Sequence, residues 1–189
     1  MAENRVLFGF SNLYVGTYSV DSNGDVTLGS PYHQPGAVGF SPEPQSDKND
    51  FYADNIAYFT SFGGGTREGD LEVAKFDDDF KTSFLGYVRT QDGGLAELKN
   101  AVKPNIYIMF QLDGDSEEEK IIMYNGTLGA ITREYSTLED SITPVTETIP
   151  VSFTGDNGTG ITVVTYKPDD AGYDTLFTNP PVPELAVSQ

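Results

Sequence analysis

Turn-forming residues recur along the whole chain and divide it into short segments of strand-forming residues. The 189 residues include 20 Gly and 11 Pro, and the stretches between them are rich in Val, Ile, Thr, Tyr and Phe. Gly and Asn supply the positive φ of tight turns, whereas β-branched and aromatic residues suit a pleated, half-buried surface. A chain of this length fits one domain with a substantial core. The sequence therefore predicts a mainly β fold, with residues 1–189 as a single domain.

Alternating and continuous apolar patterns locate the strands. Residues 105–112 are apolar on both parities, which is typical of a strand covered on both faces. In residues 147–154, Ile149, Val151 and Phe153 share one face, and Pro150 indicates an edge or a bulge. Turns are expected at residues 21–24 and 156–158, where Asn-Gly occurs. The other expected strands are 6–20, 26–28, 51–62, 70–76, 120–124 with 129–135 as an extension, and 161–166.

One short helix is expected after the first half of the sheet. Asp77, Asp78 and Asp79 would cap its start and place negative charge at the positive end of its dipole. Phe80 and Phe84, spaced i,i+4, give it an apolar face, and Gly86 is a suitable stop. Capping is a commoner role than cation binding for acidic residues at a helix start, so we interpret the three Asp as a cap.

Two proline-rich stretches do not fit the interior of a sheet. Residues 29–50 contain four prolines, and residues 168–189 contain Pro180, Pro181 and Pro183. Proline lacks the N–H that a central strand donates. We interpret 29–50 as a long loop and 168–189 as an extended arm. The loop either becomes ordered against a partner or is a flexible insertion.

Charge and composition exclude several functions. The formal net charge is −18, from 29 acidic and 11 basic residues, so reading DNA grooves through Lys and Arg is excluded. The acidic excess serves either solubility or a surface that does not retain nucleic acid. The chain has no Cys, its start lacks a signal-peptide profile, and no apolar run approaches the length of a membrane span.

No residue pattern indicates catalysis. His33 is the only histidine and has no evident nucleophile or orienting acid near it in the sequence. Asp113-x-Asp115-x-Glu117 superficially matches a calcium loop, but Gly114 stands at the second position instead of the sixth, so a solvated hairpin is the preferred interpretation. The Asn-Gly-Thr sequences at Asn125 and Asn157 are interpreted as turns. We therefore expect no enzyme activity, no cofactor and no metal.

Several ordered segments resemble a known family. They are Phe51 to Phe59, Glu68 to Ala74, Asp78 to Phe80 with Leu85 to Tyr87, Tyr124-Asn125, Ser136 to Ile142, and Thr146 to Thr148. Together they resemble the major tail proteins, or tail tube proteins, of siphoviruses, long-tailed phages that infect mainly Gram-positive bacteria. The resemblance spans roughly residues 1–180. It implies the tail-tube fold: a β-sandwich or barrel of two packed antiparallel sheets with one short flanking helix, a long loop and a C-terminal arm.

The resemblance also implies a function. Subunits of this family form hexameric rings that stack into a tube around a channel, which DNA passes during ejection without specific binding. Expected partners are further copies of the chain, the tape-measure protein inside the tube, and terminator and baseplate proteins at its ends, with no membrane. The expected location is the virion tail, assembled in the host cytoplasm.

Residue roles follow as expectations. Four acidic residues flank the strands of the second half and either line a negative channel or face the solvent outside: Glu134, Glu139, Asp140 and Glu147. The candidates for contacts between subunits lie in the loop, directly after it and in the arm: Tyr32, Phe40, Phe51, Tyr173 and Phe177. Three alternatives remain: a carbohydrate- or receptor-binding β-sandwich of a virion, a hydrolase using paired carboxylates, and a tube protein of a contractile secretion system. The absence of Trp disfavours the sugar-binding alternative.

Overall fold

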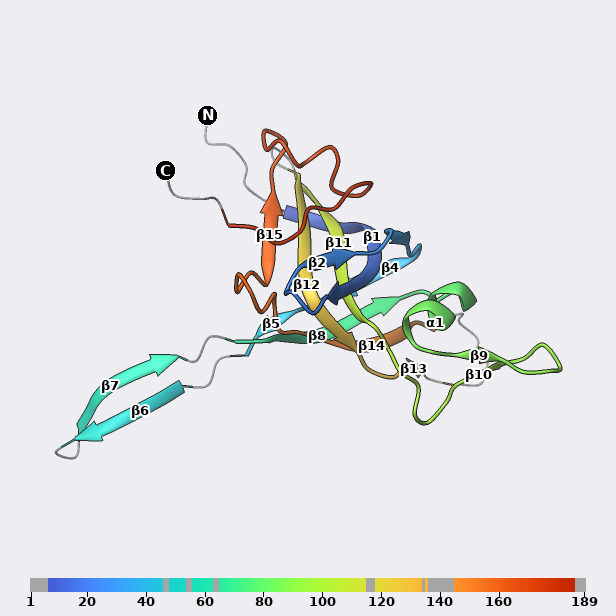
Figure 1. Ribbon diagram of the computed structural model, residues 1–189, viewed down its shortest axis with the longest axis horizontal. Coiled ribbons are helices and arrows are strands. Elements are labelled where there is room, and N and C mark those ends of the chain that lie inside the picture. The colour runs from blue at the N-terminus through green and yellow to red at the C-terminus, as the bar shows by residue number, and fades with distance from the viewer. Residues whose placement is uncertain are drawn as a thin grey trace, which may run out of the picture.

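A computed structural model describes residues 7–45, 48–53, 56–62, 65–114, 118–133, 135 and 145–185; for residues 7–8, 48–53 and 56–62 it describes the backbone only. These residues form fifteen strands and one helix (Figure 1). The strands of the large sheet are β1 (Leu7–Val20), β2 (Val26–Leu28), β3 (Tyr32–His33), β4 (Ala37–Phe40), β5 (Glu43–Pro44), β8 (Arg67–Val73), β11 (Asn105–Gly114), β12 (Glu119–Leu128), β13 (Thr132–Arg133), β14 (Glu147–Phe153) and β15 (Val163–Tyr166).

The remaining elements are β6 (Lys48–Ala53) with β7 (Ile56–Phe62), α1 (Asp78–Phe84), and β9 (Val88–Arg89) with β10 (Leu95–Ala96). The two strand pairs form separate small sheets. In Figure 1, β6 and β7 project away from the large sheet at one end, while α1, β9 and β10 lie at the other. The single strand expected over 51–62 was therefore wrong, because residues 51–53 belong to β6, which pairs antiparallel with β7.

The large sheet is antiparallel and curls over itself. Its main order is β2-β1-β11-β12-β14-β8-β4. Phe40 of β4 packs edge-on against Phe110 of β11, with ring centroids 5.5 Å apart, and lies 6.3 Å from the Phe10 ring of β1. The two layers of the expected sandwich are thus parts of one continuous sheet. This confirms the mainly β fold class.

A first core fills the inside of the curl. It combines Leu13 and Val15 of β1, Leu71 and Val73 of β8, and the inward residues of β11 and β14. Phe80 and Phe84 of α1 are buried against it, as the helical pattern predicted. Gly86 ends the helix region with φ of +68°, a conformation that glycine adopts without strain. The helix thus closes one end of this core.

A second core lies on the other face of β11 and β12. Tyr107 and Met109 of β11, Ile122 and Tyr124 of β12, and Tyr18 and Leu176 form it. Gly16 leaves room for Tyr107, since a Cβ at this position would lie 2.3 Å from its ring. Residues 106–110 are consequently buried on both faces, as predicted, but by segments of the same chain.

The C-terminal segment 168–185 covers this second core through a series of turns. Leu176 is fully buried, and Tyr124 donates a hydrogen bond from its hydroxyl to the Pro181 carbonyl at 2.8 Å. Lys120 lies 3.9 Å from the centroid of the Tyr173 ring and donates to the Tyr173 carbonyl at 2.9 Å. The extended arm expected here was wrong, because its aromatic and aliphatic side chains cover apolar residues that would otherwise face solvent.

The long loop expected over 29–50 was also wrong. Residues Tyr32–His33 pair with β1, and β4 and β5 pair with β8. Pro31, Pro35 and Pro42 stand between these strands, and Pro44 is in β5 at the sheet margin, where a missing N–H is tolerated. The prolines therefore shorten the strands without preventing them.

Asn125 and Pro150 show how the sheet accommodates irregular residues. Asn125 lies within β12 at a bulge, with φ of +55°, and donates to the Gly155 carbonyl at 2.8 Å, so the turn expected there was wrong. The turn at Asn157 was correct.

Pro150 lies within β14. Its carbonyl accepts a hydrogen bond from the Gly129 N–H, while β12 and β13 pair with other residues of β14. The missing N–H of Pro150 therefore faces the gap between β12 and β13.

Candidate assembly surfaces

A buried carboxylate ties β14 to the helix end of the molecule. Glu147 is 2% exposed, and its Oε2 accepts a 2.6 Å hydrogen bond from the Phe76 N–H. Its Oε1 lies 3.6 Å from the Lys81 ammonium and is ion-paired with Arg133. Burial lowers the pKa of Lys81, with Arg133 and Lys75 adding to the effect. One acidic residue thus joins β14, β13 and α1.

This environment overturns the expected role of Glu147. A carboxylate enclosed by its own chain and paired with two cations presents no negative charge to a channel. Glu147 stands two residues before Ile149 and four before Val151, so it points to the inward face of β14 with them. This spacing could be read from the sequence. Glu134, Glu139 and Asp140 lie outside the described residues.

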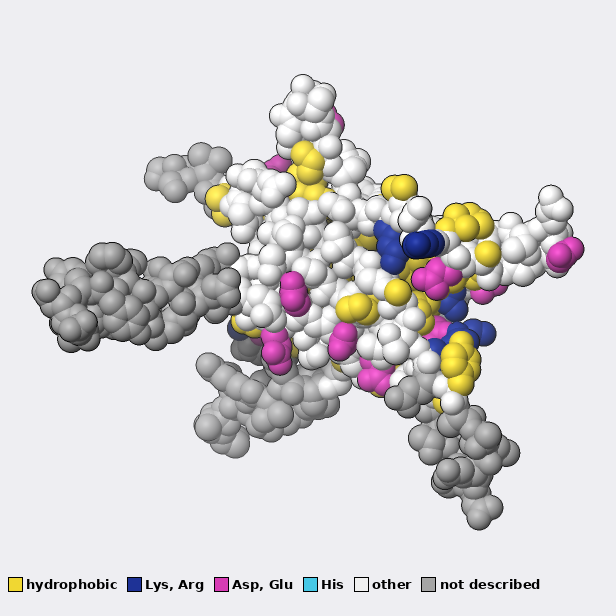
Figure 2. Space-filling model, turned by 90° about the horizontal axis from the view of Figure 1, so that it is seen from below, with side chains coloured by type: hydrophobic (Ala, Val, Ile, Leu, Met, Phe, Trp, Pro, Cys, Tyr) yellow, Lys and Arg dark blue, Asp and Glu magenta, His cyan; other side chains and the backbone are white. Residues whose placement is uncertain are grey.

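The opposite face of the same strands is acidic. Along β8, the outward residues are Glu68, Asp70 and Glu72, which stand beside Ser152, Pro150 and Thr148 of β14 respectively. Figure 2 views the molecule from below and shows acidic side chains spread over this central surface. The sequence analysis missed this face. Its signal was the alternation of acids with Leu71 and Val73 in β8.

The acidic face is hollowed. A pocket of about 450 Å³ is lined by Glu68, Gly69, Asp70, Thr127, Leu128, Gly129, Pro150, Val151 and Ser152. It lies at the gap that Pro150 leaves between β12 and β13. Ser152 donates a 3.4 Å hydrogen bond to Glu68, so the acids are held on the sheet by hydroxyl neighbours. This surface offers negative charge and small polar groups.

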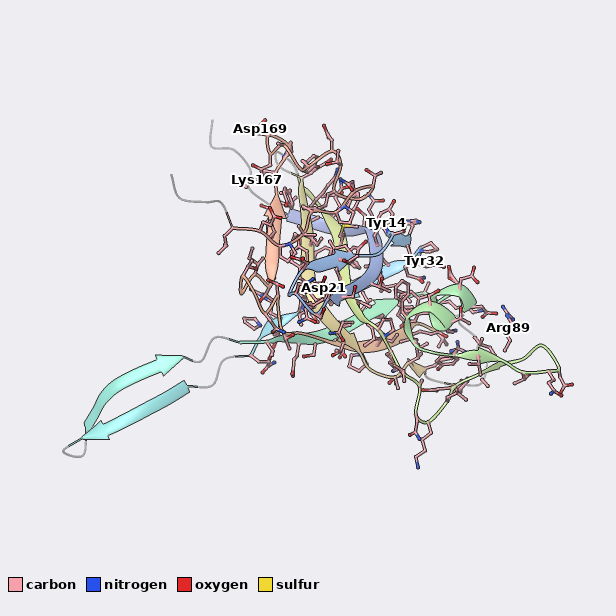
Figure 3. All side chains as sticks on the ribbon, in the orientation of Figure 1. Tyr14, Asp21, Tyr32, Arg89, Lys167 and Asp169 are labelled. Carbon is pink, nitrogen blue, oxygen red and sulfur yellow. The ribbon has the colours of Figure 1, made fainter. Side chains whose placement is uncertain are left out.

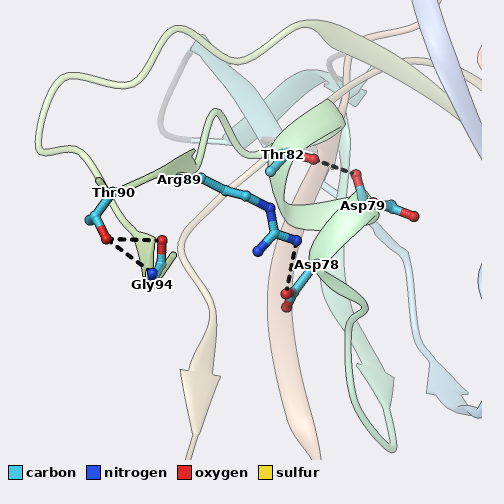
Figure 4. Close-up of polar contacts among 6 residues, drawn as sticks. All are labelled: Asp78, Asp79, Thr82, Arg89, Thr90 and Gly94. Carbon is cyan, nitrogen blue, oxygen red and sulfur yellow. Dashed lines mark hydrogen bonds and ion pairs between the residues drawn. The ribbon is translucent and has the colours of Figure 1, made fainter. Parts of the chain in front are cut away.

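The end of the molecule around α1, β9 and β10 has a different character. Arg89 lies 3.3 Å from the Asp78 carboxylate, Thr82 bonds the Asp79 carbonyl, and Thr90 closes the turn to Gly94 (Figure 4). The expected side-chain cap is wrong for Asp77, which occupies the N-cap position but makes no such bond. Its carboxylate instead accepts from the Tyr32 hydroxyl at 2.7 Å. The start of the helix is therefore fastened to β3.

The aromatic candidates for subunit contacts pack within the chain. Tyr32 contacts Phe80 and Phe84, and Phe40 contacts Phe10, Phe110 and Phe153. Tyr173 is 8% exposed, and Phe177 stacks on Tyr14 at 4.8 Å. The side chain of Phe51 lies outside the described residues. A role for these residues between subunits stays a prediction.

The part of the chain that the structure describes contains no cluster of three or more His, Asp or Glu side chains suited to holding a metal ion. Asp115 and Glu117, the later members of the possible calcium loop, lie outside that part, whereas Asp113 accepts a hydrogen bond from Gln111 at 3.1 Å. His33 packs 4.9 Å from the Tyr14 ring. Within the same residues, no helix has the length and apolarity needed to cross a membrane.

The curled antiparallel sheet with one flanking helix defines a tube-type β fold. Among solved structures, the tube-terminating cap of the anti-feeding prophage has a TM-score of 0.51 at 11% identity, covering 84% of this chain and 90% of its own. The sheath–tube complex of an extracellular contractile injection system has a TM-score of 0.49 at 12% identity, covering 84% of this chain and 90% of its own. The sheath and tube terminator of such a system has the same score and identity, covering 82% of this chain and 93% of its own.

The sequence agrees with the fold. A family model described as phage tail tube protein matches residues 2–162, so the chain belongs to the phage tail tube protein family. No curated protein sequence is significantly similar to it. Membership of this family makes the chain a structural component of a virion, and it confirms the resemblance that the sequence segments indicated.

Proposed function

We propose that this chain is the tube subunit of a long-tailed, siphovirus-type phage, and that it forms stacked hexameric rings around a channel for DNA. The single observation that carries the proposal is the acidic outward face of β8 and β14, whose outward residues include no Lys or Arg, in a chain of the tail tube family. We assign this face to the channel. Its role is mechanical and electrostatic, and no catalytic step is required of it.

Charge explains why such a face suits a conduit. Alternate residues of a strand are about 7 Å apart, so Glu68, Asp70 and Glu72 form a row of negative charge closer than the Debye length of about 8–10 Å. DNA phosphates are repelled by such a row, and Lys and Arg, which would retain DNA, are missing from its outward positions. DNA therefore passes without adhering.

The same charge opposes assembly. Six subunits carry a formal charge of 6 × −18 = −108. Burial of apolar surface between subunits, at about 25 cal/mol per Å², and counterions must offset this repulsion. The proposed partners are further copies of the chain, the tape-measure protein in the channel, and the terminator and baseplate proteins at the tube ends. Assembly would take place in the host cytoplasm.

Negative-stain electron microscopy of the purified chain, at high concentration and moderate salt, tests the proposal. Rings or hollow tubes are expected. A chain that stays monomeric under these conditions, and instead is retained by cell-wall glycans, would contradict it and favour the sugar-binding alternative.

A further inference from the structure

The net charge of the chain is unevenly distributed. Residues 75–103 contain five basic and five acidic residues, so this segment carries no net charge, and the remaining residues account for all of the −18. The ten are Lys75, Asp77, Asp78, Asp79, Lys81, Arg89, Asp92, Glu97, Lys99 and Lys103. The segment comprises α1, β9, β10 and the residues that follow them. It is the part of the molecule that a second negatively charged copy approaches with least repulsion.

Exposed aliphatic side chains gather in the same segment. Val88, Leu98 and Val102 are 43%, 47% and 92% exposed. Val88 pairs with Ala96 across β9 and β10, Ala101 donates a backbone hydrogen bond to the Leu98 carbonyl, and the Val102 carbonyl lies close to Gly86. The backbone around these three residues therefore folds back on this one segment. Figure 2 shows hydrophobic, basic and acidic side chains mixed at this end, whereas the charged side chains of the central face are acidic. We call Val88, Leu98, Lys99 and Val102 the neutral end.

Tyr135 enlarges the neutral end. Its side chain is 86% exposed, and the Arg133 guanidinium lies 5.9 Å from its ring. Burial raises the pKa of Tyr87 to about 12; a hydrogen bond to Glu97 and the nearby Glu97 and Tyr135 add to the effect, and Arg133 opposes it. Glu97 therefore already accepts a hydrogen bond from within its own chain.

The neutral end also offers a concave feature and a cation. A pocket of about 430 Å³ is lined by Glu97, Leu98, Lys99, Ala101, Lys103 and Ala130. Lys103 donates to the carbonyls of Leu128 and Gly129, whereas Lys99 is an exposed residue of the pocket lining. The rest of the chain is acidic, so a second copy presents carboxylates to this lysine.

We propose that the neutral end is one half of the contact between two copies of this chain, and that it docks on an acidic surface of the next copy. The inference rests on the proposed function. When one face of a subunit binds a different face of the next copy, the same contact can be repeated from copy to copy around a ring. A face that binds the same face of another copy gives only a dimer. The neutral end supplies apolar area and a cation, and the neighbouring copy supplies the complementary charge.

Charged substitutions at the neutral end test the proposal. Val102→Asp and Lys99→Glu change side chains that are exposed in the chain, so the folded monomer should melt at the wild-type temperature. We expect the concentration at which rings or tubes form to rise at least tenfold in both, measured by sedimentation velocity and electron microscopy. High salt should restore assembly of Lys99→Glu more than that of Val102→Asp.

Val20→Asp is the matched control, because Val20 is 46% exposed and lies outside the neutral end. It should assemble at the wild-type concentration. Wild-type assembly by Val102→Asp and Lys99→Glu would overturn the inference while leaving the proposed function intact. A wild-type chain that never assembles would overturn the proposed function and the inference together.

Discussion

The two faces of β8 and β14 use the same residue type for opposite purposes. On the inner face, Glu147 is buried, accepts a backbone N–H and pairs with Lys81 and Arg133. On the outer face, Glu68 and Asp70 are exposed beside hydroxyl groups and proline. The difference shows that a count of acids says little until strand parity is assigned. Inner acids hold the fold, and outer acids define a surface.

Removing Glu147 should have the largest effect on stability. In Glu147→Ala, Lys81 and Arg133 lose their shared partner and the Phe76 N–H loses its acceptor, so we expect a loss of about 3–5 kcal/mol in the free energy of unfolding. Urea denaturation measures it. Glu68→Ala on the outer face should change stability by less than about 0.5 kcal/mol. Equal losses in the two variants would remove the distinction between the faces.

Truncation in the second core should have the next largest effect. Leu176 is fully buried against the far face of β11 and β12. We expect Leu176→Ala to lower the free energy of unfolding by about 2–4 kcal/mol, since it removes buried methyl groups and leaves a cavity. Val182→Ala, at a residue that is 38% exposed, is the control. An unchanged Leu176→Ala variant would show that residues 168–185 are not part of the folded core in solution.

A smaller, pH-dependent effect is expected at Asp156. Its carboxylate accepts from the Tyr18 hydroxyl at 2.6 Å and from Thr159. Burial opposes ionisation, but the hydrogen bonds from Tyr18 and Thr159 outweigh it and lower the pKa of Asp156. A carboxyl with a lowered folded pKa contributes stability above its unfolded pKa, and this contribution is lost as pH falls through the folded value.

Asp156→Asn should therefore be less stable than wild type at pH 7, with a difference that shrinks as pH falls below about 4. Thermal melting of both proteins between pH 2 and 7 measures it. A difference that stays constant over this range would show that the Asp156 charge does not contribute.

Salt should show how strongly the acidic surfaces oppose assembly of the rings. Because each copy carries −18, added salt or divalent cations should lower the concentration at which rings form. Light scattering across a salt titration of the purified chain follows this change. Assembly that weakens with salt would show that attraction between charges outweighs repulsion.

Much of the fold could be predicted from the sequence. The two-sided apolar pattern of 105–112, the phenylalanine spacing of α1 and the alternation in 147–154 are local signals, and all three were confirmed. What covers the second face of β11 depends on contacts between residues 60 or more apart, such as Tyr107 with Leu176 in one core. The proline-rich stretches were wrongly interpreted as a loop and an arm. A proline shows only that its own N–H is missing, and it does not show whether the residues next to it pair with another strand.

The candidate surfaces were less accessible to sequence reasoning. Glu147 was assigned outward although its parity matched the buried residues of β14, and Glu68 and Asp70 were overlooked although they alternate with core residues in β8. The neutral end was not found from the sequence, because the exposure of Val88 and Val102 follows from how β9, β10 and the following residues are placed. Figure 3 shows how far this end, marked by Arg89, lies from Lys167 and Asp169 near the C-terminal turns.

The placement of β8 in an assembled tube tests the central claim most directly. Cryo-electron microscopy of tubes formed by the wild-type chain should show Glu68 and Asp70 facing the channel, and Glu68→Lys with Asp70→Lys should form tubes yet impair DNA ejection when introduced into the phage. Tubes in which these two residues lie on the outer wall, or a doubly substituted phage of normal infectivity, would contradict the account.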